Sequence, residues 1–248
     1  MPFGERRSAR VNGADLYYEI SGVGPAVVLL HGGLLHLGQW DDLSGRLSRD
    51  HRVIRYDRRG HGRSSFPDAP YSHSADLAGL LDALDVPNAD LVAVSAGVGV
   101  AVELAVTKPR SVRRLVLGSG PMGGYRHTEE FSSGIGAILR AGARGDKGHA
   151  ADLLAAFAPL RVAATLPDVW SRVRAMMIDD YSFAHSREDA PKSIPVSPPA
   201  ANRLAEVAAP TLVVVGDQEM DSMTEHARFL AGGIPGAHLA VIPNATTW

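Results

Sequence analysis

The chain has 248 residues, a length that suits one domain with a subdomain better than two full domains. Its formal charge is −2 and it has no long run of lysine and arginine, which argues against nucleic-acid binding and against a polybasic membrane anchor. It lacks cysteine, a leader-like apolar segment and any apolar run of about 18 residues, so disulfides and thiolate chemistry are excluded and we expect a cytoplasmic protein.

The first part of the chain alternates short apolar runs with turn signals. Residues 10–22 predict two strands joined at Asn-Gly, which is a strong hairpin signal. Residues 26–30 and 52–56 have the length and composition of buried strands. Between and after them, residues 37–47 and 74–84 show apolar side chains at helical spacing, and the serine at position 74 is the expected helix cap.

A serine marks the point where a buried strand runs directly into a buried helix. Residues 91–94 form a short β-branched run, and residues 98–106 are apolar on nearly every face. Ser95 stands at the junction, with Ala93 and Gly97 two residues away on either side. Such a turn exposes its side chain at the carboxyl edge of the sheet, next to the free amides of the helix. A plain helix cap is the alternative interpretation of this serine.

In the second part of the chain the alternation of predicted strands and helices stops and later resumes. After a strand at 114–118, the sequence predicts helices at 131–143, 150–157 and 168–179 and a proline-rich return at 190–199. A strand at 210–216, a helix at 223–230 and a strand at 237–243 follow. The whole pattern predicts an α/β fold with a doubly wound, mostly parallel sheet and a helical insertion.

Four segments, taken together, resemble the α/β-hydrolase fold superfamily. Residues 93–97 (Ala-Val-Ser-Ala-Gly) resemble its nucleophile elbow G-x-S-x-G, with alanine in the first small position. The His-Gly-Gly of residues 31–33 resembles its oxyanion turn, and residues 57–64 resemble its D-x-R-G-x-G-x-S loop. Residues 216–219 resemble the G-[DE]-x-D pattern that carries the catalytic acid. The resemblance implies a hydrolase core at 1–120 and 202–248 and a helical cap at 121–201.

The resemblance also implies roles for particular residues. Ser95 would be the nucleophile, and the amides of Gly33 and Ala96 would donate to the oxyanion. Glu219 matches the position of the acid. Its neighbours Asp217 and Asp221 stay open as alternatives. Four polar residues of the two loops are expected to have structural roles: His31, Asp57, His61 and Ser64. The methionines of the cap, with Trp170, Tyr181 and Phe183, are expected either to line the pocket or to form the core of the cap.

The catalytic histidine of the family has no counterpart in the expected place. The family pattern I-P-x-A-G-H corresponds here to residues 242–247 (Ile-Pro-Asn-Ala-Thr-Thr), so Thr247 stands at the position of the missing histidine. A threonine hydroxyl cannot accept a proton at neutral pH. The family's final helix has no counterpart within these 248 residues either, and a truncated or altered C-terminus stays open as an explanation. Other histidines remain candidate bases: His36, His127 and His185.

These features predict a serine hydrolase of small ester or lactone substrates, with weak or lost activity. The alternative is a non-hydrolytic protein of the same fold, such as a lyase, a cyclase or a small-ligand binding module. We expect no cofactor and no metal, because no H-x-x-E-H pattern or paired-histidine spacing occurs. The expected partner is a small, largely apolar substrate, with neither nucleic acid nor membrane, and a homo-oligomer is left open.

Overall fold

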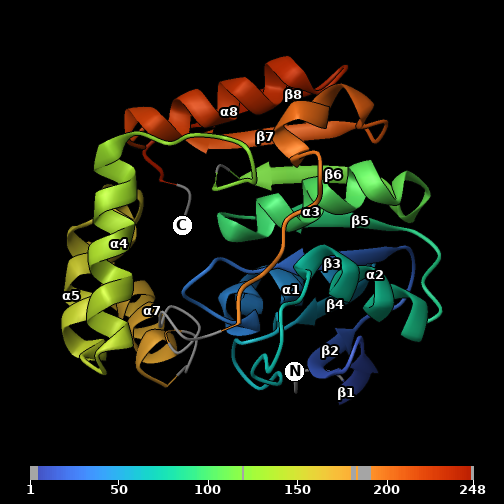
Figure 1. Cartoon of the computed structure of the whole chain (residues 1–248), viewed down its shortest axis with the longest axis horizontal. Coiled ribbons are helices and arrows are strands. Elements are labelled where there is room, and N and C mark those ends of the chain that lie inside the picture. The colour runs from blue at the N-terminus through green and yellow to red at the C-terminus, as the bar shows by residue number, and fades with distance from the viewer. Residues whose placement is uncertain (1–4, 119, 180–182, 184–190, 247–248) are drawn as a thin grey trace.

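Eight strands form one sheet in a computed structural model that describes residues 5–118, 120–179, 183 and 191–246 (Figure 1). The strands are β1 (Glu5–Val11), β2 (Ala14–Ser21), β3 (Ala26–Leu30), β4 (Arg52–Tyr56), β5 (Ala89–Ala93), β6 (Val112–Gly118), β7 (Thr211–Gly216) and β8 (His238–Ile242). Their order is β1-β2-β4-β3-β5-β6-β7-β8. β1 and β2 are antiparallel to each other and β2 to β4, and all other neighbours are parallel. The predicted mostly parallel α/β fold is confirmed.

Helices flank the sheet and also form a separate group at one of its ends (Figure 1). Those along the sheet are the 3-10 helix η1 (Leu37–Trp40), α1 (Asp41–Leu47), α2 (His73–Ala83), α3 (Ala96–Thr107), the 3-10 helices η2 (Pro109–Ser111) and η5 (Ala200–Glu206), and α8 (Asp221–Gly233). The separate group contains α4 (Glu129–Ala143), α5 (Lys147–Ala156), the 3-10 helix η3 (Ala158–Leu160), α6 (Arg161–Ala164) and α7 (Pro167–Asp179). No helix among the described residues has the length and apolar character needed to cross a membrane. The division into core and cap stays a prediction.

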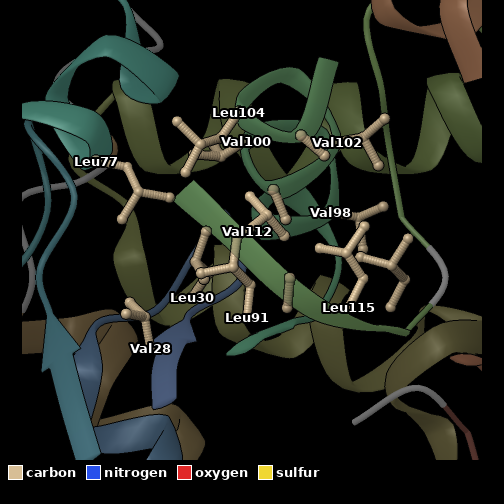
Figure 2. Close-up of a cluster of buried hydrophobic side chains, with 14 of the residues drawn as sticks. Val28, Leu30, Leu77, Leu91, Val98, Val100, Val102, Leu104, Val112 and Leu115 are labelled. Atoms are coloured by element: carbon tan, nitrogen blue, oxygen red, sulfur yellow. The ribbon is translucent and has the colours of Figure 1, made fainter. Parts of the chain in front are cut away.

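The central strands bury both of their faces. Val28 and Leu30 of β3 pack with α2, α3 and α8 in the largest apolar cluster, part of which is drawn in Figure 2. Val27 and Leu29, which alternate with them along the same strand, pack against Trp40 and the apolar side of α1. Parallel strands with two covered faces read as continuous apolar runs, which is why the sequence located β3 and β4 at their observed bounds.

Two expected helices differ from the prediction in detail. Residues 37–47 are not one helix, because η1 precedes α1 and the Leu37 amide donates to the Asp57 carboxylate at 2.8 Å. The prediction that Ser74 caps α2 is wrong. Ser72 is the cap and accepts from the Ala75 amide at 3.2 Å, while the Ser74 hydroxyl donates to the Glu103 carboxylate on α3 at 2.9 Å. The partner of Ser74 lies 29 positions away, beyond the reach of a local pattern.

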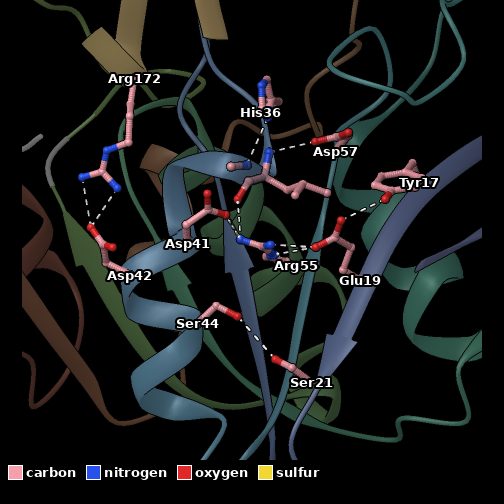
Figure 3. Close-up of polar contacts among 12 residues, drawn as sticks. Tyr17, Glu19, Ser21, His36, Asp41, Asp42, Ser44, Arg55, Asp57 and Arg172 are labelled. Carbon is pink, nitrogen blue, oxygen red and sulfur yellow. Dashed lines mark hydrogen bonds and ion pairs between the residues drawn. The ribbon is translucent and has the colours of Figure 1, made fainter. Parts of the chain in front are cut away.

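A buried arginine ties the antiparallel edge of the sheet to the helix layer (Figure 3). Arg55 of β4 is 4% exposed, and its Nε and Nη2 donate to one carboxylate oxygen of Glu19 on β2 at 3.1 and 2.7 Å. Its Nη1 donates to Asp41 at the start of α1 and to the Leu37 carbonyl. A guanidinium without water needs all of these acceptors, so the pairing fixes the position of α1 relative to the sheet.

We therefore expect Glu19→Ala to lower the free energy of unfolding by about 3 to 5 kcal/mol, because it leaves the Arg55 guanidinium buried with less negative charge beside it. Urea unfolding measures the effect. The matched control is Arg10→Ala, which breaks the exposed Arg10–Asp15 pair and should cost less than about 1 kcal/mol. Equal losses in the two variants would show that burial does not govern the Glu19–Arg55 pair.

Candidate active site

The backbone turns sharply at Ser95, between the end of β5 and the start of α3. Ser95 has φ 49° and ψ −126°, a conformation that side-chain-bearing residues rarely adopt. Two glycines make room for the turn. A Cβ on Gly97 would lie 2.6 Å from the Leu30 carbonyl oxygen, and one on Gly120 would lie 2.1 Å from the Cα of Ser95. Gly97 belongs to the local sequence pattern around Ser95, whereas the only sequence signal of Gly120 is its place just after β6.

Ser95 lines an apolar cavity of about 230 Å³ between the sheet and the separate helices. Gly33, Leu34 and Ala96 line it together with Ser95, and Phe131 of α4 and Phe157, which follows α5, line it as well. Of the aromatic residues considered as pocket lining, Trp170 and Phe183 instead belong to the apolar cluster of the separate helices. Tyr181 lies outside the described residues.

The two amides expected to bind an oxyanion belong to neighbouring residues in space. A Cβ on Gly33 would lie 3.3 Å from the Cβ of Ala96. Neither amide donates to another residue within the part of the chain that the structure describes. The Gly32 carbonyl, which belongs to the same peptide as the Gly33 N–H, accepts from Nη2 of Arg58 at 3.0 Å, and this contact orients the peptide. Both residues line the cavity, and their amides have no acceptor among the described residues.

The polar residues of the two glycine-rich loops are engaged with backbone. His31 is fully buried, its Nδ1 lies 2.7 Å from the Gly32 carbonyl, and its Nε2 accepts from the Arg58 amide at 3.0 Å. An Nε2 that accepts must be unprotonated, and burial holds the pKa of His31 well below its usual value. The Asp57 carboxylate accepts from the amides of Leu37 and Arg63, and the Ser64 hydroxyl bonds the Tyr17 amide.

The three candidate acids differ in exposure. Glu219 is half-buried, whereas Asp217 and Asp221 are exposed. The loop that carries Glu219 is joined to the segment after β8, because the amides of Asp217 and Gln218 donate to the Ile242 and Ala245 carbonyls at 3.0 Å. Thr247, two residues after Ala245, lies outside the described residues.

His226 and His127 lie next to each other, and His226 contacts Gly120, which packs against Ser95. His226 of α8 is fully buried and its Nδ1 accepts from the Gly120 amide at 3.3 Å. Burial, with a smaller effect from His127, lowers the pKa of His226 to about 3, so it is neutral at physiological pH. Burial also lowers the pKa of His127, whose ring stacks on Phe131. His36 caps η1 through Nδ1, and His185 lies outside the described residues. Among the described residues, no three metal-binding side chains gather.

The strained turn gives a first prediction for this site. Strain of this kind costs about 1 to 3 kcal/mol, and glycine relieves it at an entropic cost of about 0.5 to 1 kcal/mol. Ser95→Gly should therefore raise the free energy of unfolding by about 1 kcal/mol in urea titrations. Ser95→Ala is the control, because it retains a Cβ and the strain. If the two variants had the same stability, the turn would not be strained.

The low pKa of His226 gives a second prediction. Below pH ~6.5 the unfolded chain binds a proton at this residue and the folded protein does not, so folding stability falls as the pH drops from about 6.5 towards about 3. His226→Asn keeps an acceptor for the Gly120 amide but cannot titrate. It should reduce the slope of unfolding free energy against pH by about 1 kcal/mol per pH unit near pH 5. The exposed His238→Asn is the control, and an unchanged slope in His226→Asn would contradict the assignment.

The comparisons with known proteins lead to one and the same family. A family model described as alpha/beta hydrolase fold matches residues 25–246. The chain is 25% identical over 241 residues to the pimeloyl-[acyl-carrier protein] methyl ester esterase of Nitrosospira multiformis, covering 94% of this chain and 91% of that protein. It is 36% identical over 125 residues to the 2-hydroxymuconate semialdehyde hydrolase of Pseudomonas sp. CF600, covering 48% and 43%. The chain spans less than half the length of several curated relatives that it matches.

A solved structure leads to the same family. The enol-lactonase from Burkholderia xenovorans LB400 has a TM-score of 0.77 and 25% sequence identity, and the match covers 95% of this chain and 90% of that one. The family model covers well over half of the chain, and the structural match extends over nearly all of it. This chain belongs to the α/β-hydrolase fold family, and its named relatives include hydrolases.

Proposed function

We propose that the protein is a serine hydrolase that acts on small, largely apolar esters or lactones through Ser95. One observation carries the proposal: Ser95 occupies a strained turn and lines an apolar cavity together with Gly33 and Ala96, whose amides have no acceptor among the described residues. A serine that only capped a helix would accept a hydrogen bond from the helix, and Ser95 makes no such side-chain bond.

The geometry supports acyl transfer as the reaction class. The Ser95 oxygen would attack the carbonyl carbon of the substrate and form a covalent acyl-enzyme, with release of the alcohol. In a lactone the alcohol stays attached to the acyl group. The negative charge that develops on the carbonyl oxygen would be bound by the amides of Gly33 and Ala96, and one such donor typically contributes about 10² to 10³ in rate. Water would then release the acid.

The substrate class follows from the cavity and from the relatives. An apolar space of about 230 Å³ suits a small, uncharged acyl group. Two proteins similar to this chain are named as a methyl ester esterase and an enol-lactonase. Both names describe the cleavage of an acyl–oxygen bond, which is the chemistry that an oxyanion site serves.

The proposed reaction needs a general base, and the position expected to supply it holds a threonine. We propose that Glu219 is the acid, supported by its half-buried position, and that Thr247 occupies the place of the histidine. Loss of one triad member typically removes about 10⁴ to 10⁶ in rate, and oxyanion donors and binding leave about 10³ to 10⁴ over water. His226 is a poor substitute because its Nδ1 is occupied and its pKa is about 3. The same lack of a base favours the second candidate, a non-hydrolytic protein that uses the cavity for binding.

Labelling with a fluorophosphonate tests the nucleophile and the base together. We expect the unmodified chain to react slowly and to hydrolyse p-nitrophenyl acetate feebly. Thr247→His should increase both rates by about 10², since a positioned general base contributes about 10² to 10⁴. Thr247→Ser is the matched control, because it replaces one hydroxyl with another. Ser95→Ala should not be labelled at all.

Other outcomes would overturn parts of this proposal. Rapid labelling of the unmodified chain at Ser95 would mean that another histidine, such as His36 or His127, serves as the base. Labelling that persists in Ser95→Ala would remove Ser95 from the mechanism. No gain in Thr247→His, with slow labelling throughout, would favour the binding protein.

The acid can be assigned in the Thr247→His protein. Glu219→Gln should lower the rate of p-nitrophenyl acetate hydrolysis by at least about 10-fold, because the histidine would lose the carboxylate that orients it. Asp217→Asn and Asp221→Asn are controls from the same loop and should have little effect. If Asp217→Asn or Asp221→Asn gives the larger loss, the role of the acid moves to that residue.

A further inference from the structure

The hairpin turn between β1 and β2 consists of an asparagine followed by a glycine. Asn12 and Gly13 form the entire turn, because Val11 pairs with Ala14 across the two strands. The φ values of 47° at Asn12 and 80° at Gly13 are those of a tight hairpin turn. Both turn residues are exposed, whereas Val11 and Ala14 are 5% and 2% exposed. The turn therefore meets water while the strand ends beside it are fixed in the core.

The backbone nitrogen of Gly13 is unshielded. A Cβ on Gly13 would meet no other atom within 4 Å, so open space surrounds this residue. Its amide donates to no backbone acceptor in the segments that the structure describes. Hydroxide can therefore remove the proton from this nitrogen and leave a nucleophile. The side-chain amide of the preceding residue offers that nucleophile an electrophilic carbon, Cγ of Asn12.

The Asn12 side chain also attaches the turn to a buried ion pair. Its Nδ2 donates to Oδ1 of Asp76 on α2 at 3.1 Å. Asp76 pairs with Arg59 through both of its carboxylate oxygens, at 2.9 and 2.8 Å, and the two side chains are 3% and 5% exposed. Nη2 of Arg59 donates to the Asn12 carbonyl at 2.9 Å as well. The turn is thus joined to α2 and to the loop after β4 through these three residues.

Asn12 differs from the other asparagines of the chain in the residue that follows it. The sequence has four asparagines, and Asn12 alone precedes a glycine; the others are Asn88, Asn202 and Asn244. A side chain on the following residue crowds the nitrogen that would attack, whereas glycine has no side chain. Ring closure by the following nitrogen is therefore expected at Asn12 before it occurs at the other three.

We propose that Asn12 is a deamidation site and that its conversion loosens the attachment of the hairpin to α2. The Gly13 nitrogen, having given its proton to hydroxide, attacks Cγ of Asn12 and forms a cyclic imide. The bond between Cγ and Nδ2 breaks, and the nitrogen takes protons from water and leaves as ammonia. Water then opens the imide at either carbonyl, which gives aspartate or isoaspartate. The net reaction consumes water and releases ammonia.

Both products disturb the contacts of the turn. Aspartate replaces the amide donor that faces Asp76 with a second carboxylate, and like charges at this distance repel each other. Isoaspartate adds a carbon atom to the main chain, so the turn no longer matches the pairing of Val11 with Ala14. The Asn12–Asp76 hydrogen bond must open before the ring closes. The folded protein should therefore react more slowly than the unfolded chain.

Incubation in H₂¹⁸O at mildly alkaline pH tests the reaction. Tandem mass spectrometry of the tryptic peptide 11–46 should locate ¹⁸O at residue 12, more slowly in the folded protein than in urea. Enzymatic methylation of isoaspartyl groups should detect the second product. Asn12→Gln keeps a side-chain amide but would have to close a larger ring, so it should stay unlabelled. Absence of ¹⁸O at residue 12 of the folded protein, or equal labelling at Asn88, Asn202 or Asn244, overturns the proposal.

Urea unfolding of matched variants tests the consequence. Asn12→Asp, which is one of the two products, should lower the ratio of folded to unfolded protein by about 5- to 30-fold. The loss should shrink below about pH 4, where the added carboxyl group takes up a proton. Asn12→Gly removes the same hydrogen bond without adding a charge and should lose less. Equal stability of Asn12→Asp and Asn12→Gly would refute the loosening of the hairpin. Neither test depends on the reaction proposed at Ser95.

Discussion

The turn at Ser95 is the constraint on which the rest of the candidate site depends. A chain that leaves β5 and enters α3 within one residue needs a positive φ at Ser95 and close backbone contacts around it. Gly97 allows the approach of the Leu30 carbonyl, and Gly120 allows the loop after β6 to touch Ser95 itself. These contacts hold the ends of β3, β5 and β6 together. Gly33 and Ala96 lie next to each other at this point.

The same turn divides the apolar space beneath the separate helices. Leu34 and Ser95 face one cavity, and Leu35 and Val94 face the other. Helices from the separate group line both spaces, so few fixed charges lie near either one. An apolar surround strengthens any hydrogen bond that a ligand makes to the Gly33 and Ala96 amides. It also disfavours charged ligands.

In the described part of the chain, most buried charged side chains form ion pairs that stabilise the fold. Arg55 pairs with Glu19 and Asp41, and Arg59 pairs with Asp76 at 2.8 Å with both side chains nearly fully buried. His31 and His226 stay neutral because burial disfavours the cation and lowers the pKa of each. A base for Ser95 therefore has to be supplied by a residue with better access to solvent or to a carboxylate. This requirement makes position 247 decisive for the proposed function.

The sequence by itself determined the elements and their order. The Asn12-Gly13 turn has φ values of 47° and 80°, as its hairpin signal predicts, and the buried strands β3 and β4 match their apolar runs. These features depend on local backbone preference and side-chain periodicity, so they can be predicted from a single segment of the sequence. The turn at Ser95 could be predicted from the sequence for the same reason, because its small neighbours lie within two residues of it.

Only the tertiary structure decided which distant residues meet. The choice of Ser72 over Ser74 as a cap depends on Glu103, and the role of Gly120 depends on its contact with Ser95. The half-burial of Glu219 likewise arises from packing against other segments. Contacts between residues far apart in the chain have no periodic signature, and so burial, pairing and cavity shape had to come from the folded protein.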